Sequence, residues 1–225
     1  MILVFASSKG GVGKSTTCAA VGAALALGGA SVLIIDLDPN RTVERWSRKA
    51  NVSGLSVAAI APGEFTSHLA RQAGEFDHIL IDLMGSREST ALKAFARADL
   101  VIIPAQASEP DIREAIVVAK DVRAMAAEIC RDIPYRLLLT KMFPLRTRFG
   151  DHALAELERL KMPCFGIPLV ERSAYREMFL SGEPPTRCEQ GRGAGAEIDC
   201  LIVEIRQIVG RKQTAGQGQR LEKAG

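Results

Sequence analysis

Short apolar segments alternate with helix-like stretches along almost the whole chain. The apolar segments carry Val, Ile and Leu at consecutive positions, so both faces of each predicted strand must be covered. Strand–helix alternation of this kind predicts an α/β fold, a doubly wound, mostly parallel sheet with helices on both faces. The predicted strands are Ile2–Ala6, Ser31–Asp36, Leu55–Ile60, His78–Asp82, Leu100–Pro104, Arg136–Thr140 and Cys164–Ile167.

The chain length suits one domain. Its 225 residues can bury a substantial core, and residues 1–209 contain no linker or internal repeat. Residues 210–225, GRKQTAGQGQRLEKAG, are polar, Gly-rich and basic, which predicts a disordered tail. The predicted helices are Lys14–Leu27, one within 40–50, Asp111–Ile129, Asp151–Leu160 and about Ala194–Val209.

Composition narrows the function classes. Aromatic residues are only 5% of the chain, which argues against a surface that stacks nucleic-acid bases. The longest apolar-rich run, Cys18–Leu27, is too short to span a bilayer, and Met1–Ala6 lacks the basic region of a signal peptide, so a cytoplasmic protein with no membrane partner is expected. Five scattered cysteines predict buried reduced thiols rather than a metal site: Cys18, Cys130, Cys164, Cys188 and Cys200.

A glycine-rich loop follows the first predicted strand. Lys9–Thr16 reads KGGVGKST, although Ser8 occupies the first glycine position of the general phosphate-loop pattern G-x-x-x-x-G-K-[ST]. Glycines let consecutive backbone N–H groups turn toward phosphate oxygens, and the following helix N-terminus favours the same anion. An ordinary strand-to-helix turn is the alternative. The residues predicted to contact ATP here are Lys9, Gly10, Gly11, Val12, Gly13, Lys14, Ser15 and Thr16.

Within this loop, Lys14 is predicted to contact the β- and γ-phosphates, and the Ser15 hydroxyl to ligate Mg²⁺. Carboxylates follow two other predicted strands, namely Asp36 and Asp38 in IDLDPN and Asp82 in HILID. Because ligands bind at the carboxyl ends of the strands in such a sheet, these carboxylates are expected near the loop. The alternatives are an Asx-type turn for the first pair and a strand-end cap for Asp82.

The motif KGGVGKS, with the additional Lys9, resembles the deviant Walker A motif of the ParA/MinD-type ATPases, a family of P-loop NTPases. The resemblance implies that Lys9 reaches the nucleotide of the partner subunit, so that ATP supports a homodimer. It also implies that Asp38 orients the attacking water and that Asp36 lies in the outer shell around Mg²⁺. The implied catalytic residues are therefore Lys14, Asp38 and Lys9.

The same resemblance extends over Met1–Gly182. Asp82 matches the Walker B carboxylate that holds Mg²⁺ through water, and Leu83-Met84-Gly85-Ser86 matches the second switch loop. Two segments match those that flank adenine in the family, which implies contacts from Lys141 and Pro168. Asn40 departs from the glutamine that many members carry. The cofactors expected are ATP and Mg²⁺, and the activity expected is slow ATP hydrolysis.

The sequence constrains the biological role of such a switch less than it constrains the ATPase chemistry. Resemblance to small ParA proteins implies DNA partitioning, with non-specific DNA binding and a ParB-like partner that stimulates hydrolysis. The alternatives are a VirC-type ATPase of conjugative DNA transfer and an ATP-bound positioning scaffold. A small kinase or ligase would need an acceptor pocket for which no constellation is present. The residues predicted to contact DNA are Arg187, Arg192, Arg206, Arg211 and Lys212. Ordinary surface charge is the alternative interpretation of these residues.

Overall fold

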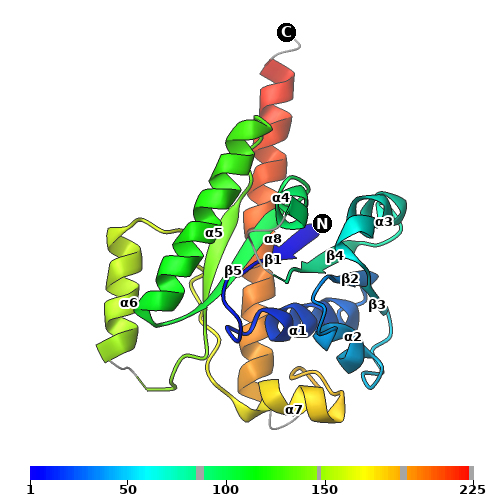
Figure 1. Cartoon of the computed structure of the whole chain (residues 1–225), viewed down its shortest axis with the longest axis vertical. Coiled ribbons are helices and arrows are strands. Elements are labelled where there is room, and N and C mark those ends of the chain that lie inside the picture. The colour runs from blue at the N-terminus through cyan, green and yellow to red at the C-terminus, as the bar shows by residue number, and fades with distance from the viewer. Residues whose placement is uncertain (85–88, 146–147, 188–191, 223–225) are drawn as a thin grey trace.

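The computed structural model describes residues 1–84, 89–145, 148–187 and 192–222. Its centre is a six-stranded sheet in the order β3-β2-β4-β1-β5-β6, in which every pair of neighbours is parallel (Figure 1). The strands are β1 Ile2–Phe5, β2 Val32–Asp36, β3 Leu55–Ala59, β4 His78–Asp82, β5 Leu100–Gln106 and β6 Tyr135–Thr140. The predicted doubly wound α/β fold is therefore confirmed.

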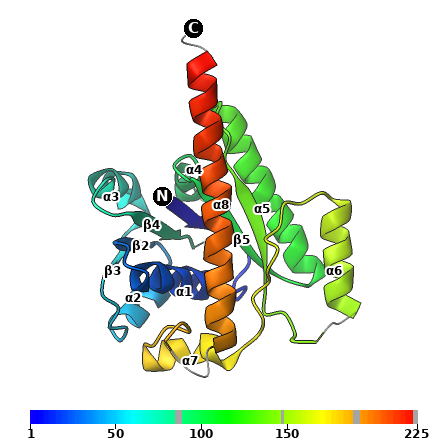
Figure 2. The same cartoon turned by 180° about the vertical axis from the view of Figure 1, so that it is seen from behind.

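The helices fill the connections between strands and follow the sheet. In chain order they are α1 Lys14–Leu27, α2 Thr42–Ser47, the 3₁₀ turn Pro62–Glu64, α3 Phe65–Gln72, α4 Ser89–Phe95, α5 Glu109–Glu128, α6 Arg148–Arg159, α7 Ser173–Ser181 and α8 Arg192–Glu222. Figure 2 shows α8 crossing the face of the sheet that also carries α1, and its C-terminal end projects beyond the body.

Two hydrophobic cores lie on opposite faces of the sheet because successive residues of a strand point to opposite sides. In β1, Leu3 and Phe5 face a core with α1, α2, α7 and α8, whereas Val4 faces a core with α3, α4, α5 and α6. Every strand except the edge strand β3 is largely buried on both sides. The consecutive apolar residues of the sequence are thus explained by two covered faces.

The seventh predicted strand, Cys164–Ile167, is not a strand. Two isolated bridges, Leu137 with Cys164 and Met142 with Val170, and a few backbone hydrogen bonds join this region to its neighbours. Pro168 has no N–H to donate, and the Gly166 N–H donates to the Glu204 carboxylate of α8. The Leu137 carbonyl accepts from Phe165 and the Leu139 carbonyl from Leu169, so the pairing skips Ile167 and no continuous ladder forms.

The C-terminal region also differs from the sequence prediction. Helix α8 continues to Glu222, so the backbone of residues 210–222 is helical where a disordered tail was predicted. Extending an existing helix needs no new nucleation step, and the Gln, Arg, Lys, Leu and Glu residues of the tail have good helix propensity. The domain boundary at 209 stays a prediction. No helix in the described residues is long and apolar enough to cross a membrane.

Candidate nucleotide-binding site

The glycine loop leaves β1 and enters α1 through backbone that favours glycine. Gly11 has φ +78° and Gly13, the N-cap of α1, has φ +87°. A Cβ added at Gly10 or Gly11 would meet no atom within 4 Å, so an open space lies against the loop. The Thr140 hydroxyl donates to the Val12 carbonyl at 2.7 Å, and the Lys141 ammonium donates to the Gly11 carbonyl at 2.6 Å. The end of β6 therefore anchors the loop.

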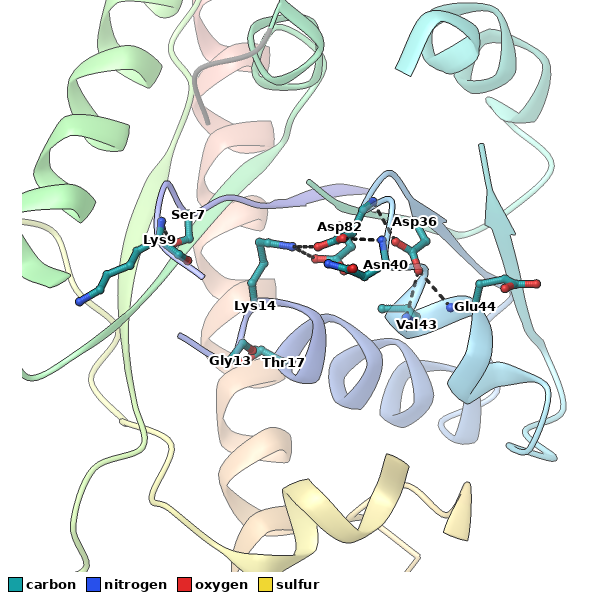
Figure 3. Close-up of polar contacts among 11 residues, drawn as sticks. Ser7, Lys9, Gly13, Lys14, Thr17, Asp36, Asn40, Val43, Glu44 and Asp82 are labelled. Carbon is teal, nitrogen blue, oxygen red and sulfur yellow. Dashed lines mark hydrogen bonds and ion pairs between the residues drawn. The ribbon is translucent and has the colours of Figure 1, made fainter. Parts of the chain in front are cut away.

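Lys14 begins α1 and is only 8% exposed. Its Nζ lies 2.7 Å from Asp82 Oδ1 and 4.0 Å from Asp38 Oδ2 (Figure 3). The two carboxylates come from the ends of different strands, as the sequence predicted. Parallel register places Asp36 of β2 beside Asp82 of β4, and Asp82 beside Phe5 at the end of β1.

Asp82 is fully buried. Burial raises the pKa of its carboxyl, and the Lys14 ammonium and the Ser15 hydroxyl oppose that rise. Within the described part of the chain, Oδ2 of Asp82 has no hydrogen-bond partner. A buried carboxylate oxygen without a partner is costly, so it suits a site that receives a further ligand such as water of a hydrated cation.

Asp36 has a different environment, although it is equally buried. Its Oδ1 accepts the Asp38 N–H, and its Oδ2 accepts the Val43 and Glu44 N–H groups, each at 3.0 Å. Burial raises the pKa of the Asp36 carboxyl and these backbone N–H groups oppose the rise. Both oxygens are thus engaged by the backbone, and Asp36 fixes the turn that carries Asp38 and starts α2. Its outer-shell role around Mg²⁺ stays a prediction.

Lys9 points away from Lys14 in Figure 3. Its ammonium forms an ion pair with Asp111, a buried residue in the first turn of α5. The neighbouring Ser8 hydroxyl donates to Glu114 Oε2 at 2.6 Å, one turn further along the same helix. The two loop residues are therefore held by α5, and the Lys9 ammonium is directed toward Asp111 rather than toward Lys14. Sequence reasoning did not find this pair of tethers.

A cavity of about 560 Å³ opens beside the loop, a size typical of small-ligand sites. Of the residues predicted to contact the nucleotide, Val12, which is buried, and Pro168 do not line it, although Leu169 and Val170 next to Pro168 do. It is lined in full by Lys9, Gly10, Gly11, Gly13, Lys14, Ser15, Thr16, Thr17, Asp38, Met84, Thr140, Lys141, Leu169, Val170, Glu171, Arg172, Tyr175, Arg176 and Phe179.

The sequence analysis missed the far wall of this cavity. Arg172, Tyr175 and Arg176 come from the start of α7, and Phe179 lies one turn further along the helix. The position of this helix in the sequence could have indicated the wall, because the helix follows a segment predicted to end at the carboxyl edge of the sheet. The predicted switch residues Gly85 and Ser86 lie outside the described residues.

Other sequence-predicted residues do not gather at this site. Of the four described cysteines, all free, only Cys18 is buried; Cys130 and Cys200 are exposed, so the prediction of buried thiols was wrong for them. Cys130 follows the end of α5 in a turn, and Cys200 lies on an exposed side of α8. Cys188 lies outside the described residues. No cluster of His, Cys, Asp and Glu that could hold a metal was found in the described part.

The residues predicted to contact DNA do not form one cluster, as far as the structure describes their side chains. The Arg187 guanidinium donates to the Asn51 carbonyl after α2, whereas Arg206 of α8 is close enough to His78 to help lower that histidine's pKa. Arg206 and Arg211 are exposed. The side chains of Arg192 and Lys212 lie outside the described part.

The residues of the cavity fit a Mg²⁺-bound nucleoside triphosphate. An open glycine loop leads into a helix N-terminus, Lys14 supplies a buried positive charge, the Ser15 hydroxyl lines the cavity, and Asp82 has a free oxygen. With a parallel sheet whose strand ends carry these groups, the fold and the site define a phosphate-loop nucleotide-binding protein.

Comparison with known proteins narrows this class. Residues 3–185 match the model of the CobQ/CobB/MinD/ParA nucleotide binding domain, and the chain belongs to this family of deviant Walker A ATPases. It is 31% identical to a protein ParA of Rhizobium radiobacter over 189 residues, covering 80% of this chain and 83% of the relative. It is 29% identical to protein virC1 of Rhizobium rhizogenes over 184 residues, covering 79% of each chain.

Solved structures share the fold at lower sequence identity. The ATP complex of McdA from Cyanothece superposes with a TM-score of 0.73 at 18% identity, covering 93% of this chain and 96% of the other. The cell division ATPase MinD of Pyrococcus furiosus superposes with a TM-score of 0.72 at 18% identity, covering 92% and 99%. At this identity the likeness establishes the fold alone.

Proposed function

We propose that this chain is an ATP-dependent dimerising switch ATPase that acts in DNA partitioning through nucleotide-controlled, non-specific DNA binding. The observation that carries the proposal is that two lysines of one loop have different partners. Lys14 is buried against Asp82 beside the cavity, whereas the Lys9 side chain points away from Lys14 and its ammonium pairs with Asp111 at the rim. One lysine therefore serves the chain's own nucleotide, and the other is available to a second copy.

Lys14, Ser15 and Asp82 are the residues that would hold the Mg²⁺–ATP complex. Lys14 would bind the terminal phosphates, the Ser15 hydroxyl would ligate the cation, and Asp82 would hold it through water. The bound cation supplies charge neutralisation on the phosphates. Glycine-loop N–H groups at the start of α1 add a fixed positive potential at the same place.

Asp38 is the residue we assign to the attacking water. Its side chain is only 17% exposed, lines the cavity, and is held by the Asn40 N–H at 2.8 Å to Oδ1. Asp36 fixes the backbone beneath it through three N–H groups. A carboxylate placed in this way can orient a water and accept its proton, and a slow intrinsic rate follows when no stronger base is present.

Lys9 of one subunit would complete the site of the other in an ATP-bound homodimer. A positive charge supplied in trans stabilises the charge that develops on the phosphates, so hydrolysis and assembly become coupled. We further propose that dimerisation gathers basic side chains into a surface that retains DNA, and that a ParB-like protein stimulates hydrolysis and releases it. The 31% identity to a protein ParA supports this use.

A second candidate is an ATPase that assembles conjugative DNA-transfer complexes. It is favoured by the similarity to virC1 proteins, which match nearly the same share of the chain as ParA does. A scaffold that binds ATP without hydrolysing it is disfavoured by the retained Asp38, which such a scaffold does not need.

The deciding experiment is retention of the purified protein on non-specific duplex DNA in ATP and in ADP at low salt, with hydrolysis measured with and without the DNA. We expect retention in ATP alone, slow hydrolysis, and loss of retention as salt is raised. Lys14→Ala is the control that removes nucleotide binding and should abolish retention. Equal retention in ATP and in ADP, or no retention in either, would reject the partition proposal and favour the conjugative role or the scaffold.

A further inference from the structure

One carboxylate of α8 collects hydrogen bonds from the far wall of the cavity. Glu197 Oε1 accepts Arg172 Nε at 2.8 Å and lies 2.7 Å from Arg172 Nη2. Its Oε2 accepts the Val170 N–H at 3.2 Å and the Tyr175 hydroxyl at 3.1 Å. A carboxylate has about four lone-pair sites, so this one is fully used.

The environment strengthens these bonds. The Glu197 side chain is 11% exposed, and burial together with the Glu197 charge raises the pKa of Tyr175, which keeps its hydroxyl protonated as a donor. Gly193, one turn earlier on α8, leaves room for the guanidinium: a Cβ there would lie 2.6 Å from Arg172 Cζ. The arrangement therefore depends on both a carboxylate and a missing side chain on the same helix.

The groups bound by Glu197 form one end of the cavity. Residues of the glycine loop line the phosphate end, whereas Leu169, Val170, Arg172, Tyr175 and Phe179 line the other. Because the loop fixes where the phosphates lie, the nucleoside must extend toward this second wall. Glu197 itself does not line the cavity.

The sheet alone does not hold this wall. The segment that leads into it meets β6 through backbone hydrogen bonds that skip residues, such as Leu169 N–H to the Leu139 carbonyl, and Gly166 is bound by a second α8 carboxylate, Glu204, two helical turns beyond Glu197. Glu204 and Glu197 thus fasten the segment at two points, Gly166 outside the cavity and Val170 on its wall. This provides a matched pair of carboxylates, one beside the cavity wall and one away from it.

We propose that Glu197 is a positioning residue for nucleotide binding: it fixes Val170, Arg172 and Tyr175 as the wall against which the nucleoside of ATP lies. The proposal deepens the proposed nucleotide binding and rests on it. It predicts that loss of the Glu197 charge weakens binding of the nucleoside part of ATP while leaving binding of the phosphates intact.

The test is Glu197→Gln, with the affinities for Mg²⁺–ATP and for Mg²⁺–tripolyphosphate measured by calorimetry. A glutamine has one acceptor oxygen and turns an NH₂ group toward donors, so it cannot satisfy both Arg172 and the Val170–Tyr175 pair. We expect affinity for ATP to fall roughly tenfold, as for loss of a charged hydrogen bond, and affinity for tripolyphosphate to stay unchanged.

Two further variants complete the design. Glu204→Gln is the matched control and should leave both affinities at the wild-type values. Gly193→Ala displaces the Arg172 guanidinium without touching Glu197, and should weaken ATP binding in the same direction; alanine favours the helix, so loss of folding does not explain such a result.

The outcomes separate the two proposals. If the wild-type protein binds no ATP, the proposed function fails. If it binds ATP and Glu197→Gln binds it equally well, or loses ATP and tripolyphosphate in parallel, the positioning role is overturned while the nucleotide site stands. An equal effect of Glu204→Gln would also overturn it, because the wall would then not be the cause.

Discussion

Lys14 holds its positive charge almost out of contact with water, and a fully buried carboxylate faces it. Separating such a pair leaves a buried charge without a partner, which costs on the order of 3–5 kcal/mol. Asp82 and Lys14 therefore stabilise each other when no nucleotide is bound. In the proposed complex with Mg²⁺–ATP, phosphate would give Lys14 an alternative partner, and the cation would give one to Asp82.

Asp38 can be tested without disturbing that pair. We predict that Asp38→Ala binds ATP as the wild type does, because Lys14 keeps its 2.7 Å contact with Asp82, whereas hydrolysis falls by about a hundredfold or more through loss of the water-positioning carboxylate. Single-turnover phosphate release measures the second effect. Asp38→Asn keeps an oxygen for the Asn40 N–H and serves as control for backbone disorder. Wild-type turnover in both variants would exclude the role.

His78 gives a prediction about pH. Burial, followed by the N-terminal ammonium, lowers the pKa of this histidine in the folded chain, whereas in the unfolded chain it has its ordinary value of 6.5. The unfolded state then binds more protons, so this group lowers stability as pH falls through 6.5 toward the folded pKa. We expect thermal unfolding between pH 7.5 and 5.5 to shift less in His78→Gln than in the wild type. Equal shifts would show that His78 is not responsible.

At the scale of elements, α1 packs closely on the sheet because of Gly22. A Cβ there would lie 2.7 Å from Ile34 Cδ1 and 3.3 Å from Leu80 Cδ2, both fully buried. We predict that Gly22→Ala destabilises the fold by roughly 1 kcal/mol, since overpacking of about 1–3 kcal/mol outweighs the gain in helix propensity. Denaturant unfolding measures it.

Ile34→Val removes the Cδ1 atom and provides the internal control for that prediction. Alone it should cost about 1 kcal/mol, but in combination with Gly22→Ala it relieves the overlap, so the double variant should be more stable than the sum of the single effects. Strict additivity would mean that the crowding at Ile34 is not what limits a side chain at position 22.

Elements were predictable where the apolar pattern is long and its ends are marked. Helix α1 was predicted with its observed bounds, Lys14–Leu27, because a glycine loop and Gly28 delimit it. The segment Cys164–Ile167 reads as a strand but depends on an α8 carboxylate thirty-eight residues beyond Gly166. A contact with a helix so far along the chain is not visible in the local sequence.

The candidate site also has one part that the sequence predicts and one part that it does not. The phosphate end, with Lys14, Asp38 and Asp82, could be predicted because a sheet of parallel strands gathers its carboxyl ends. The wall around Arg172 and Tyr175 was not predicted, because both residues bind Glu197, which lies on a helix that the chain reaches only later. Its dependence on tertiary packing leaves no spacing signal.

For the whole molecule, the decisive question is what Lys9 does when ATP binds. In the single chain it is paired with buried Asp111, and the loop is tethered a second time through Ser8 and Glu114. An ammonium has three donors, so Lys9 can change or share its partner without leaving the surface of α5. A second subunit that offers phosphate oxygens would compete with Asp111 for it.

We therefore predict that Lys9→Ala still binds ATP but remains a monomer, because Lys14 serves the subunit's own nucleotide while the contact in trans is lost. Light scattering after size-exclusion chromatography, with Mg²⁺–ATP in the Asp38→Ala background to slow hydrolysis, would show a dimer for the parent and a monomer for the Lys9 variant. Ser8→Ala is the matched control: it removes the neighbouring tether to Glu114 and keeps the Lys9 charge, so it should dimerise. A normal ATP-dependent dimer of Lys9→Ala would refute the contact in trans, and with it the coupling of nucleotide state to assembly on which the partition proposal depends.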